Sequence, residues 1–314
     1  MKFFIGYRIF LSVLCSLFSV LLSGCQNNPL YKDTQVLMGT FVEVISPQKE
    51  AAGIVFEEIR RLENLLSKYK PDSEVSRLNK LGELQVSKDT LYILKKAKEL
   101  WQATDGAFDI TVAPLVDLWG FTDKRYSVPQ DEEIKKSLQL VGSDKISFDK
   151  INNVVKFSVS GMKIDLGAIA KGYALDCAGS KLKEKNINNC LVNAGGQILC
   201  LGDKFGKPWD IAVRNPRGKD YLRILELKDK SVATSGDYQQ YFLKGNKRYA
   251  HILNPKTGYP VNSGVISATV IANDGLTADA LATAIVVLGK DKGVSLIKRF
   301  PGIEAQITEE KDLK

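Results

Sequence analysis

In the first half of the chain, apolar residues recur every three or four positions, which is the period of an amphipathic helix. This pattern predicts helices over about 50–68, 88–103 and 131–140. Ser87 stands where the second of these helices needs an N-terminal cap. The expected buried faces are Val55, Ile59, Leu62, Leu66 and Tyr69 in the first helix, and Leu91, Leu94 and Trp101 in the second.

From residue 145 onward the pattern changes to short apolar runs and alternation, which are typical of β-strands. Two further helices are expected at about 168–185 and 277–288, followed by a short helix and strand at the end of the chain. Because helices and strands occur in blocks, the sequence predicts an α+β fold. The expected strands are 145–148, 154–159, 162–166, 190–201, 209–214, 221–227, 240–244, 247–253 and 265–272.

The N-terminus carries the features of a bacterial export signal. Two basic residues precede an apolar run over 9–22, which is shorter than the roughly 20 residues that a membrane-spanning helix needs. The run ends in Leu-Ser-Gly-Cys25, which resembles the lipobox of bacterial lipoproteins. The resemblance implies a signal peptide over 1–24 and lipidation of Cys25. The polar residues that follow predict a tether over 25–35, ahead of a folded domain over 36–314.

A second interpretation of this leader is an uncleaved anchor with a chance cysteine. Both interpretations place the rest of the chain outside the cytoplasm and attached to a membrane, on the periplasmic side in a Gram-negative cell. The sequence therefore predicts an extracytoplasmic protein that a lipid or a peptide anchor holds at the membrane.

The composition is that of an ordinary globular protein, with 44% hydrophobic and 25% charged residues. It excludes the disordered, collagen-like and polytopic membrane classes. The 44 basic and 36 acidic residues give a net charge of +8, but the basic residues are scattered and form no stripe. A nucleic-acid partner is therefore not expected, whereas a modest positive field suits an anionic small molecule.

The spacing of the three cysteines that follow the leader leaves two possibilities open for Cys190 and Cys200. Cys177, Cys190 and Cys200 form no C-x-x-C pattern, and with His251 they would make a Cys₃His set whose spacing does not suit zinc. Cys190 and Cys200 flank Gly195-Gly196 evenly and could pair in a disulfide. The other interpretation is that both are small buried core residues.

The segment from Asp165 to Lys171 is predicted as a strand end, a glycine turn and a helix start. A helix N-terminus offers free N–H groups and a positive dipole end, where a lysine is unfavourable unless an anion lies nearby. Lys171 would then face an anion such as a phosphate, or else extend into solvent. Asp165 would bond the polar edge of a ligand, or else cap the helix.

Asp279 and Thr283 are four residues apart and should share one face of the helix predicted over 277–288. A carboxylate and a hydroxyl are hard oxygen ligands of the kind that Mg²⁺ prefers. The alternative is that Asp279 complements the helix dipole while Thr283 bonds back to the backbone.

Two further segments contain polar residues in positions that suit a ligand. His251 is the single histidine of the chain and lies near the end of the strand predicted over 247–253. Asp109, in Gly-Ala-Phe-Asp109, follows a predicted helix and could place a carboxylate and backbone amides against a ligand, or only turn the chain. The chain contains no dinucleotide-binding glycine motif, Walker loop, H-E-x-x-H or G-x-S-x-G pattern.

Together, these motifs resemble those of the ApbE family of FAD:protein FMN transferases over about residues 36–309. A lipoprotein leader is also usual in that family. The resemblance implies an α+β fold of the ApbE type, with mixed or antiparallel sheets flanked by helices and an FAD cleft between subdomains. The matching segments begin at Met38, Ser67, Ser73, Gly106, Leu118, Ile164, Val192, Ser231, His251 and Thr277.

The resemblance also implies roles for individual positions. His251 matches the family's histidine beside the reacting phosphate. Some members have another acidic residue where Ala282 stands, so the metal shell has one carboxylate fewer here. The implied FAD contacts are Met38, Tyr69, Ala107, Phe108, Asp109, Asp165, Lys171 and Ile252, and the implied Mg²⁺ ligands are the Ala168 carbonyl, Asp279 and Thr283.

The implied reaction is a Mg²⁺-dependent phosphoryl transfer from FAD to a Thr or Ser hydroxyl of a flavin-accepting protein, with release of AMP. His251 would act as the general base. The family's usual acceptors are subunits of membrane redox pumps and related extracytoplasmic flavoproteins. Two alternatives remain open: a Mg²⁺-dependent FAD pyrophosphatase that produces FMN and AMP, and a flavin-binding lipoprotein without enzyme activity.

Overall fold

The structure is a computed structural model that describes residues 29–313. The predicted signal peptide and Cys25 lie outside the described residues. Residues 31–313 lie in one compact unit. Nowhere between residues 29 and 313 is a helix both long and apolar enough to cross a membrane.

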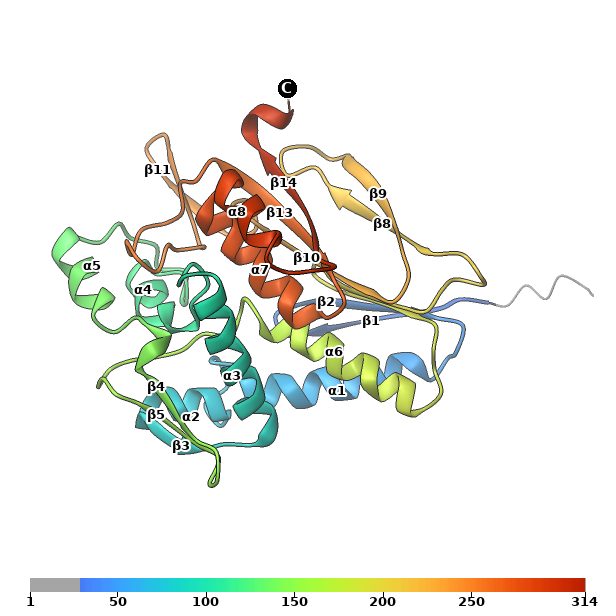
Figure 1. The fold of residues 1–314 in the computed structure, drawn as a ribbon, viewed down its shortest axis with the longest axis horizontal. Helices are drawn as coiled ribbons and strands as arrows, with labels where there is room; N and C mark the ends of the chain where they lie inside the picture. The colour runs from blue at the N-terminus through green and yellow to red at the C-terminus, as the bar shows by residue number, and fades with distance from the viewer. Residues whose placement is uncertain (1–28, 314) are drawn as a thin grey trace, which may run out of the picture. The chain divides into compact units, whose positions relative to one another are not determined.

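A seven-stranded sheet, antiparallel throughout, is the framework of this unit (Figure 1). Strand β13 (Val265–Ala272) is buried along its whole length and marks the centre of the core. In spatial order the strands are β1 (Tyr31–Leu37), β2 (Thr40–Ser46), β6 (Cys190–Ala194), β7 (Gln197–Leu201), β10 (Lys230–Gly236), β13 (Val265–Ala272) and β14 (Glu304–Glu309).

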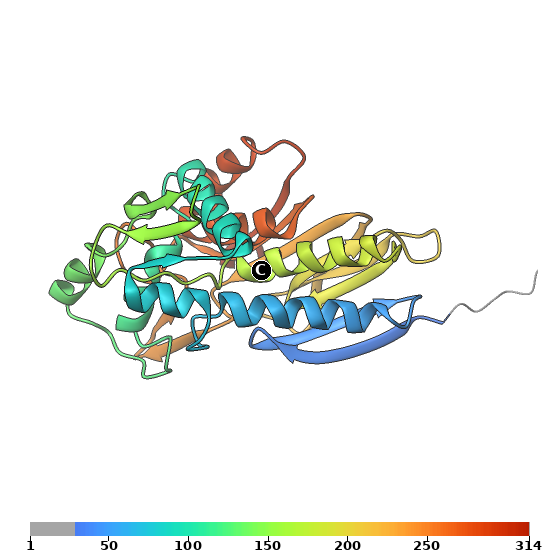
Figure 2. The same ribbon diagram turned by 90° about the horizontal axis from the view of Figure 1, so that it is seen from below.

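Helices pack on this sheet and join it in one hydrophobic core. They are α1 (Ala51–Leu66), which packs on β2, α6 (Ala170–Glu184), which packs on β7, and α7 (Gly275–Leu288), which packs on β10 and β13. Figure 2 shows α1 and α6 running side by side along the sheet. The apolar stripe of α1 forms because Val55, Ile59 and Leu62 recur at helical spacing and are all buried.

The remaining elements surround this core. The helices are α2 (Glu74–Leu81), α3 (Lys88–Ala103), α4 (Ala113–Leu118), α5 (Asp131–Leu138) and α8 (Lys290–Ile297). The strands are β3 (Glu83–Gln85), β4 (Ile146–Asp149), β5 (Val154–Phe157), β8 (Trp209–Arg214), β9 (Tyr221–Leu227), β11 (Tyr241–Lys244) and β12 (Lys247–Ala250). A second, smaller hydrophobic cluster lies around α4 and α5 and contains Leu115, Trp119, Phe121, Ile134, Val141 and Leu253.

The α+β prediction is confirmed, but several local predictions differ from the structure. The tether was expected to reach residue 35, whereas β1 already begins at Tyr31 and pairs with β2. Most of β1 is exposed, so no apolar alternation reveals it. Tyr69 lies beyond the end of α1 and is 66% exposed instead of extending its buried face. The short polar helix α2 was missed, although Ser73 caps it by accepting from Ser76 N–H.

Residues 162–166 were expected to form a strand, and the structure shows an extended segment without a partner strand. The alternation is real, because Met162, Ile164 and Leu166 are buried. The backbone of Ile164 bonds instead to the side-chain amide of Asn79, at 2.8 and 2.9 Å. An asparagine side chain thus replaces the neighbouring strand, which a pattern of apolar positions cannot foresee.

Glycines allow the backbones of α6 and α7 to approach closely. A Cβ atom on Gly172 would lie 2.0 Å from the carbonyl oxygen of Gly275. We expect Gly172→Ala to lower the free energy of unfolding by about 1–3 kcal/mol, because backbone atoms cannot move aside as side chains do. Gly53→Ala is the matched control: Gly53 is exposed in α1 with nothing within 4 Å of the added atom. That control should be neutral or stabilise by about 0.5–1 kcal/mol in urea unfolding.

Candidate active site

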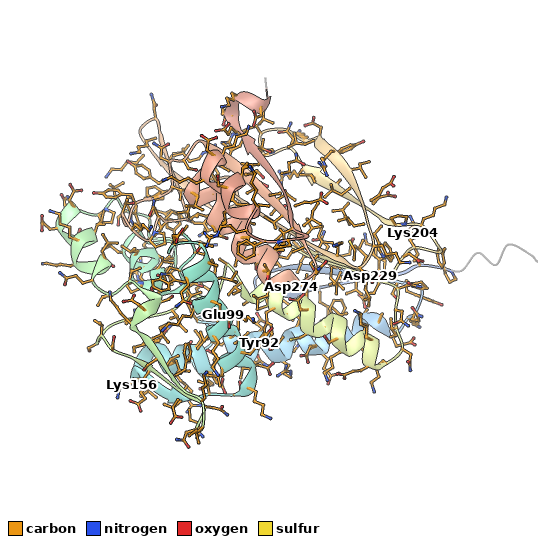
Figure 3. The ribbon with its side chains drawn as sticks, in the orientation of Figure 1. Tyr92, Glu99, Lys156, Lys204, Asp229 and Asp274 are labelled. Carbon is orange, nitrogen blue, oxygen red and sulfur yellow. The ribbon has the colours of Figure 1, made fainter. Side chains whose placement is uncertain are left out.

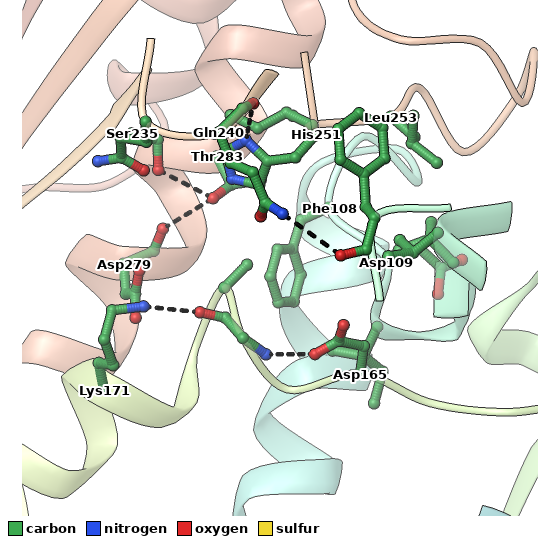
Figure 4. Close-up of a pocket in the computed structure, with 18 of the residues that line it drawn as sticks. Phe108, Asp109, Asp165, Lys171, Ser235, Gln240, His251, Leu253, Asp279 and Thr283 are labelled. Atoms are coloured by element: carbon green, nitrogen blue, oxygen red, sulfur yellow. Dashed lines mark hydrogen bonds between the residues drawn. The ribbon is translucent and has the colours of Figure 1, made fainter. Parts of the chain in front are cut away.

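A cavity of about 270 Å³ lies where the two hydrophobic clusters meet. Phe108 and Ile252 of the main core line it, together with Phe121 and Leu253 of the smaller cluster. Figure 4 shows Phe108 and Leu253 on one side of the cavity and a polar wall formed by Lys171, Asp279, Thr283 and Ser235 on the other. The cavity therefore has one end suited to a planar ring system and one suited to an anion.

Asp279 is the central residue of the polar wall. It is 1% exposed and lies on the face of α7 that looks toward α6. Its carboxylate accepts hydrogen bonds from Gly172 N–H at 3.2 Å and from Gln197 Nε2 at 2.6 Å. Burial raises the pKa of Asp279, while the nearby ammonium of Lys171 partly offsets this rise.

Thr283 lies one turn after Asp279 on the same face, as the spacing predicts. Its hydroxyl is 3.0 Å from the hydroxyl of Ser235 on β10. Its 3.4 Å contact with the Asp279 backbone carbonyl is the back-bond that the alternative interpretation required. That contact is long, so the hydroxyl stays available to a ligand in the cavity.

Lys171 is the second residue of α6 and lines the cavity. Its ammonium donates to the Gly167 carbonyl at 2.8 Å, which folds the side chain back over the turn before the helix. Ala168 lies in the same turn and also lines the cavity. The structure thus brings the side chain of Lys171 to the cavity, in keeping with a nearby anion.

His251 follows β12 and contributes the one imidazole of the chain to the cavity. Its Nδ1 lies 3.1 Å from the backbone carbonyl of Gln240. Because a carbonyl oxygen can only accept, this contact assigns the proton to Nδ1 and leaves Nε2 as an acceptor. Burial lowers the pKa of His251, and the charge of Lys171 lowers it further.

Asp165 anchors the turn between the extended segment and α6. Its Oδ2 lies 2.8 Å from the buried ammonium of Lys68, and its Oδ1 accepts from Gly167 N–H at 2.8 Å. Burial disfavours the charge of Lys68, but the ion pair with Asp165 more than offsets this and raises its pKa. Asp165 therefore stabilises the turn and does not cap the helix. Tyr69 stands beside this pair with its ring 5.1 Å from the Lys68 ammonium.

Asp109 lines the cavity, but its carboxylate is occupied within the fold. It accepts from the backbone N–H and hydroxyl groups of Thr111 and Ser143, at 2.7 to 3.2 Å. Burial raises the pKa of Asp109, and these donors counteract the rise. Asp109 thus fixes the loop that carries Ala107 and Phe108 to the cavity wall. The structure therefore favours the interpretation in which Asp109 turns the chain over the one in which its carboxylate binds a ligand.

The cavity brings together eleven of the twelve predicted FAD, metal and catalytic positions, Met38 being the exception. Met38 lies in the turn between β1 and β2, where its N–H donates to Glu63 Oε1 at 3.0 Å. Its neighbour Thr40 packs against Gly195, which does line the cavity. Met38 is therefore close to the rim but outside the wall, and its contact with FAD stays a prediction.

Several lining residues escaped the sequence analysis. Gln197 and Ser235 come from β7 and β10, and Gln240 takes part through its backbone carbonyl. Gln197 directly follows Gly195-Gly196, which was a recognisable signal. The other lining residues that we did not predict are Ile110, Val112, Val116, Phe121, Gly167, Gly195, Thr234, Gln239, Leu253 and Pro255.

The structure supports the interpretation that Cys190 and Cys200 are small buried core residues. Cys177, Cys190 and Cys200 are all free in the described part of the chain. Cys190 pairs with Leu201 and Cys200 pairs with Leu191, so the two side chains point to opposite faces of the β6–β7 hairpin. A disulfide between Cys190 and Cys200 would require a shift of register.

The polar wall offers an oxygen donor set that fits Mg²⁺. Asp279 is a buried carboxylate beside the neutral oxygens of Thr283 and Ala168, and Gln197 Oε1 is buried without a hydrogen-bond partner. Among residues 29–313, no three His, Cys, Asp or Glu side chains gather as a metal cluster. Mg²⁺ commonly completes its shell with waters and substrate phosphates, so one carboxylate is sufficient.

The sequence and the structure have clear relatives. A family model described as the ApbE family matches residues 38–307. A FAD:protein FMN transferase from Klebsiella pneumoniae is 32% identical over 295 residues, which cover 91% of this chain and 92% of that protein. One from Vibrio cholerae is 36% identical over 246 residues, or 76% of this chain and 73% of that protein.

Solved structures agree with this grouping. The ApbE protein from Thermotoga maritima superposes with a TM-score of 0.84 at 39% identity, covering 90% of this chain and 95% of that one. The flavin transferase ApbE from Vibrio cholerae gives a TM-score of 0.81 at 32% identity with the same coverage. The chain therefore belongs to the ApbE family.

Proposed function

We propose that this protein transfers the FMN moiety of FAD to a Thr or Ser hydroxyl of a target flavoprotein and releases AMP. The cavity supports this function because it joins an apolar end for a ring system to a polar wall of Lys171, Asp279 and Thr283. The relatives named as FAD:protein FMN transferases support the same reaction.

In this proposal, the protein binds and orients the pyrophosphate while His251 moves a proton. Lys171 attracts the phosphate charge, and Asp279, Thr283 and the Ala168 carbonyl would hold Mg²⁺. When bound, Mg²⁺ neutralises charge on the phosphate oxygens. Nε2 of His251 accepts the proton of the attacking hydroxyl, and the hydroxyl oxygen bonds to the FMN-side phosphorus. The bond to the AMP phosphate then breaks, so FMN remains on the acceptor as a phosphoester.

The test is the intact mass of an acceptor protein after incubation with the purified protein, FAD and Mg²⁺. A gain of one FMN is the expected result, and EDTA should abolish it because Asp279 then faces the phosphates as an uncompensated anion. Steady AMP release without a mass gain would identify a pyrophosphatase instead. FAD binding without either product would contradict the proposal.

We also propose that the protein is a lipoprotein held at an extracytoplasmic membrane surface through Cys25. The Leu-Ser-Gly-Cys25 sequence after an apolar run supports this location. The mass of the protein extracted from membranes should match a chain that begins with an acylated Cys25. Cys25→Ala should release the protein from the membrane fraction, and continued membrane attachment of that variant would contradict the proposal.

A further inference from the structure

We infer that the β11–β12 hairpin is a docking surface for the acceptor protein, and that it selects acceptors with acidic residues flanking the modified hydroxyl. This inference rests on the proposed function and adds the chemistry of the protein partner. The hairpin forms a two-stranded sheet of its own, outside the seven-stranded framework (Figure 1). Leu243, Lys244 and Lys247 on this hairpin are exposed and can contact another protein.

The hairpin is joined directly to the reacting end of the cavity. Gln240 precedes β11 and His251 follows β12, and both line the cavity. The Gln240 carbonyl accepts from both the backbone N–H and Nδ1 of His251, at 3.0 and 3.1 Å. An acceptor chain that places a hydroxyl at Nε2 of His251 must therefore pass close to this hairpin.

One face of the hairpin is fixed by aromatic packing. Phe242 stacks on Tyr249 with ring centres 5.0 Å apart, and on Tyr126 with ring centres 5.2 Å apart. Tyr249 also lies 5.6 Å from Trp119, in the smaller hydrophobic cluster. The hairpin is thus a rigid platform, which lowers the entropic cost of binding a partner.

The exposed parts of the hairpin are basic and apolar. Residues 241–250 contain Lys244, Lys247 and Arg248 but no acidic residue. Arg248 lies 3.6 Å from Asp237, whereas no carboxylate among residues 29–313 forms a salt bridge with Lys244 or Lys247. Leu243 is 64% exposed and pairs with Arg248, so it lies on the opposite face of the hairpin from the paired residues Lys244 and Lys247. An acidic segment complements the exposed lysines at the end of this hairpin in charge.

The test uses fluorescent peptides with one Thr, flanked either by acidic residues and a leucine or by lysines and a leucine. Anisotropy measures their binding to the full chain loaded with FAD, and mass spectrometry measures FMN transfer. We expect the acidic peptide to bind about tenfold more tightly than the basic one at low salt, with the difference shrinking as salt rises. The double variant Lys244→Glu with Lys247→Glu should reverse this preference without changing the affinity for FAD.

The chain provides a matched control in the turn Lys204-Phe-Gly-Lys207. This turn also carries two exposed lysines three residues apart, and Figure 3 labels Lys204 on the opposite side of the domain from β11. The double variant Lys204→Glu with Lys207→Glu has the same net charge but should keep the wild-type peptide preference. If the two double variants changed the peptide preference equally, the preference would arise from the net charge of the protein and not from the hairpin. That result would overturn the inference.

Two other outcomes separate the inference from the proposed function. Transfer to both peptides with equal affinity and no salt dependence would overturn the docking surface while leaving the transferase intact. Selective binding of the acidic peptide without FMN transfer would support the docking surface and contradict the transferase.

Discussion

Replacing Asp279 with alanine should lower the rate of FMN transfer at saturating FAD by about a hundredfold or more. Loss of the one carboxylate in the proposed Mg²⁺ set removes several kcal/mol of charge stabilisation, and each 1.4 kcal/mol corresponds to about tenfold in rate. Calorimetric titration of Mg²⁺ in the presence of FAD should show weakened metal binding. Asp279→Asn should show a similar loss, because an amide keeps the shape but not the charge.

Two controls keep this result interpretable. The alanine variant leaves Gly172 N–H and Gln197 Nε2 without their acceptor, which costs about 1–3 kcal/mol for each buried group, so its melting temperature has to be measured. Asp291→Asn changes an exposed carboxylate in the first turn of α8 and should leave both activity and Mg²⁺ binding unchanged. Unaltered Mg²⁺ dependence in a folded Asp279→Ala protein would show that the metal set is wrong.

Replacing His251 with alanine should lower FMN transfer by about 10²–10⁴-fold, the usual contribution of a general base. FAD binding should change little, because the phosphate contacts proposed for Lys171 remain. His251→Gln is the informative partner variant: its amide can still donate to the Gln240 carbonyl but cannot take up a proton near neutral pH. Comparable losses in both variants would assign the effect to proton transfer and not to packing.

The pH profile gives an independent measurement on the same residue. Because burial lowers the pKa of His251 below its ordinary value of about 6.5, the imidazole is neutral at pH 7 and becomes protonated only in more acidic solution. Activity should therefore fall as the pH drops through a midpoint below 6.5, and this acidic limb should be absent in His251→Gln. A limb that persists in the variant would point to another base.

The sequence predicts strands well where apolar residues alternate with polar ones or form a short run. The alternation in 209–214 predicted β8, and the mainly apolar runs in 221–227 and 265–272 predicted β9 and β13, all with their observed bounds. β10 was missed because its residues, Lys-Ser-Val-Ala-Thr-Ser-Gly, are mostly small and polar, although the strand is almost entirely buried. Tertiary packing, not residue preference, makes this segment a strand.

The residues of the candidate site also fall into two groups, those that the sequence predicts and those that it does not. Asp279 and Thr283 were predictable because helical spacing places them on one face, and Asp165 and Lys171 because a turn and a helix start leave a recognisable order of residues. Gln197 and Ser235 reach the cavity only because β7 and β10 are neighbours in the sheet. The role of the Gln240 carbonyl could not be foreseen, since every residue has a backbone carbonyl and no pattern marks the one that is used.

The glycine contact between α6 and α7 has a consequence for substrate preference. α6 carries Lys171 and α7 carries Asp279, and their backbones touch at Gly172 and Gly275. The polar wall is consequently pre-organised, so little conformational entropy remains to be lost when a phosphate binds. Discrimination between nucleotides then falls to the apolar end, which Phe108, Phe121 and Leu253 line. Engineering of altered dinucleotide specificity should therefore begin with these three side chains.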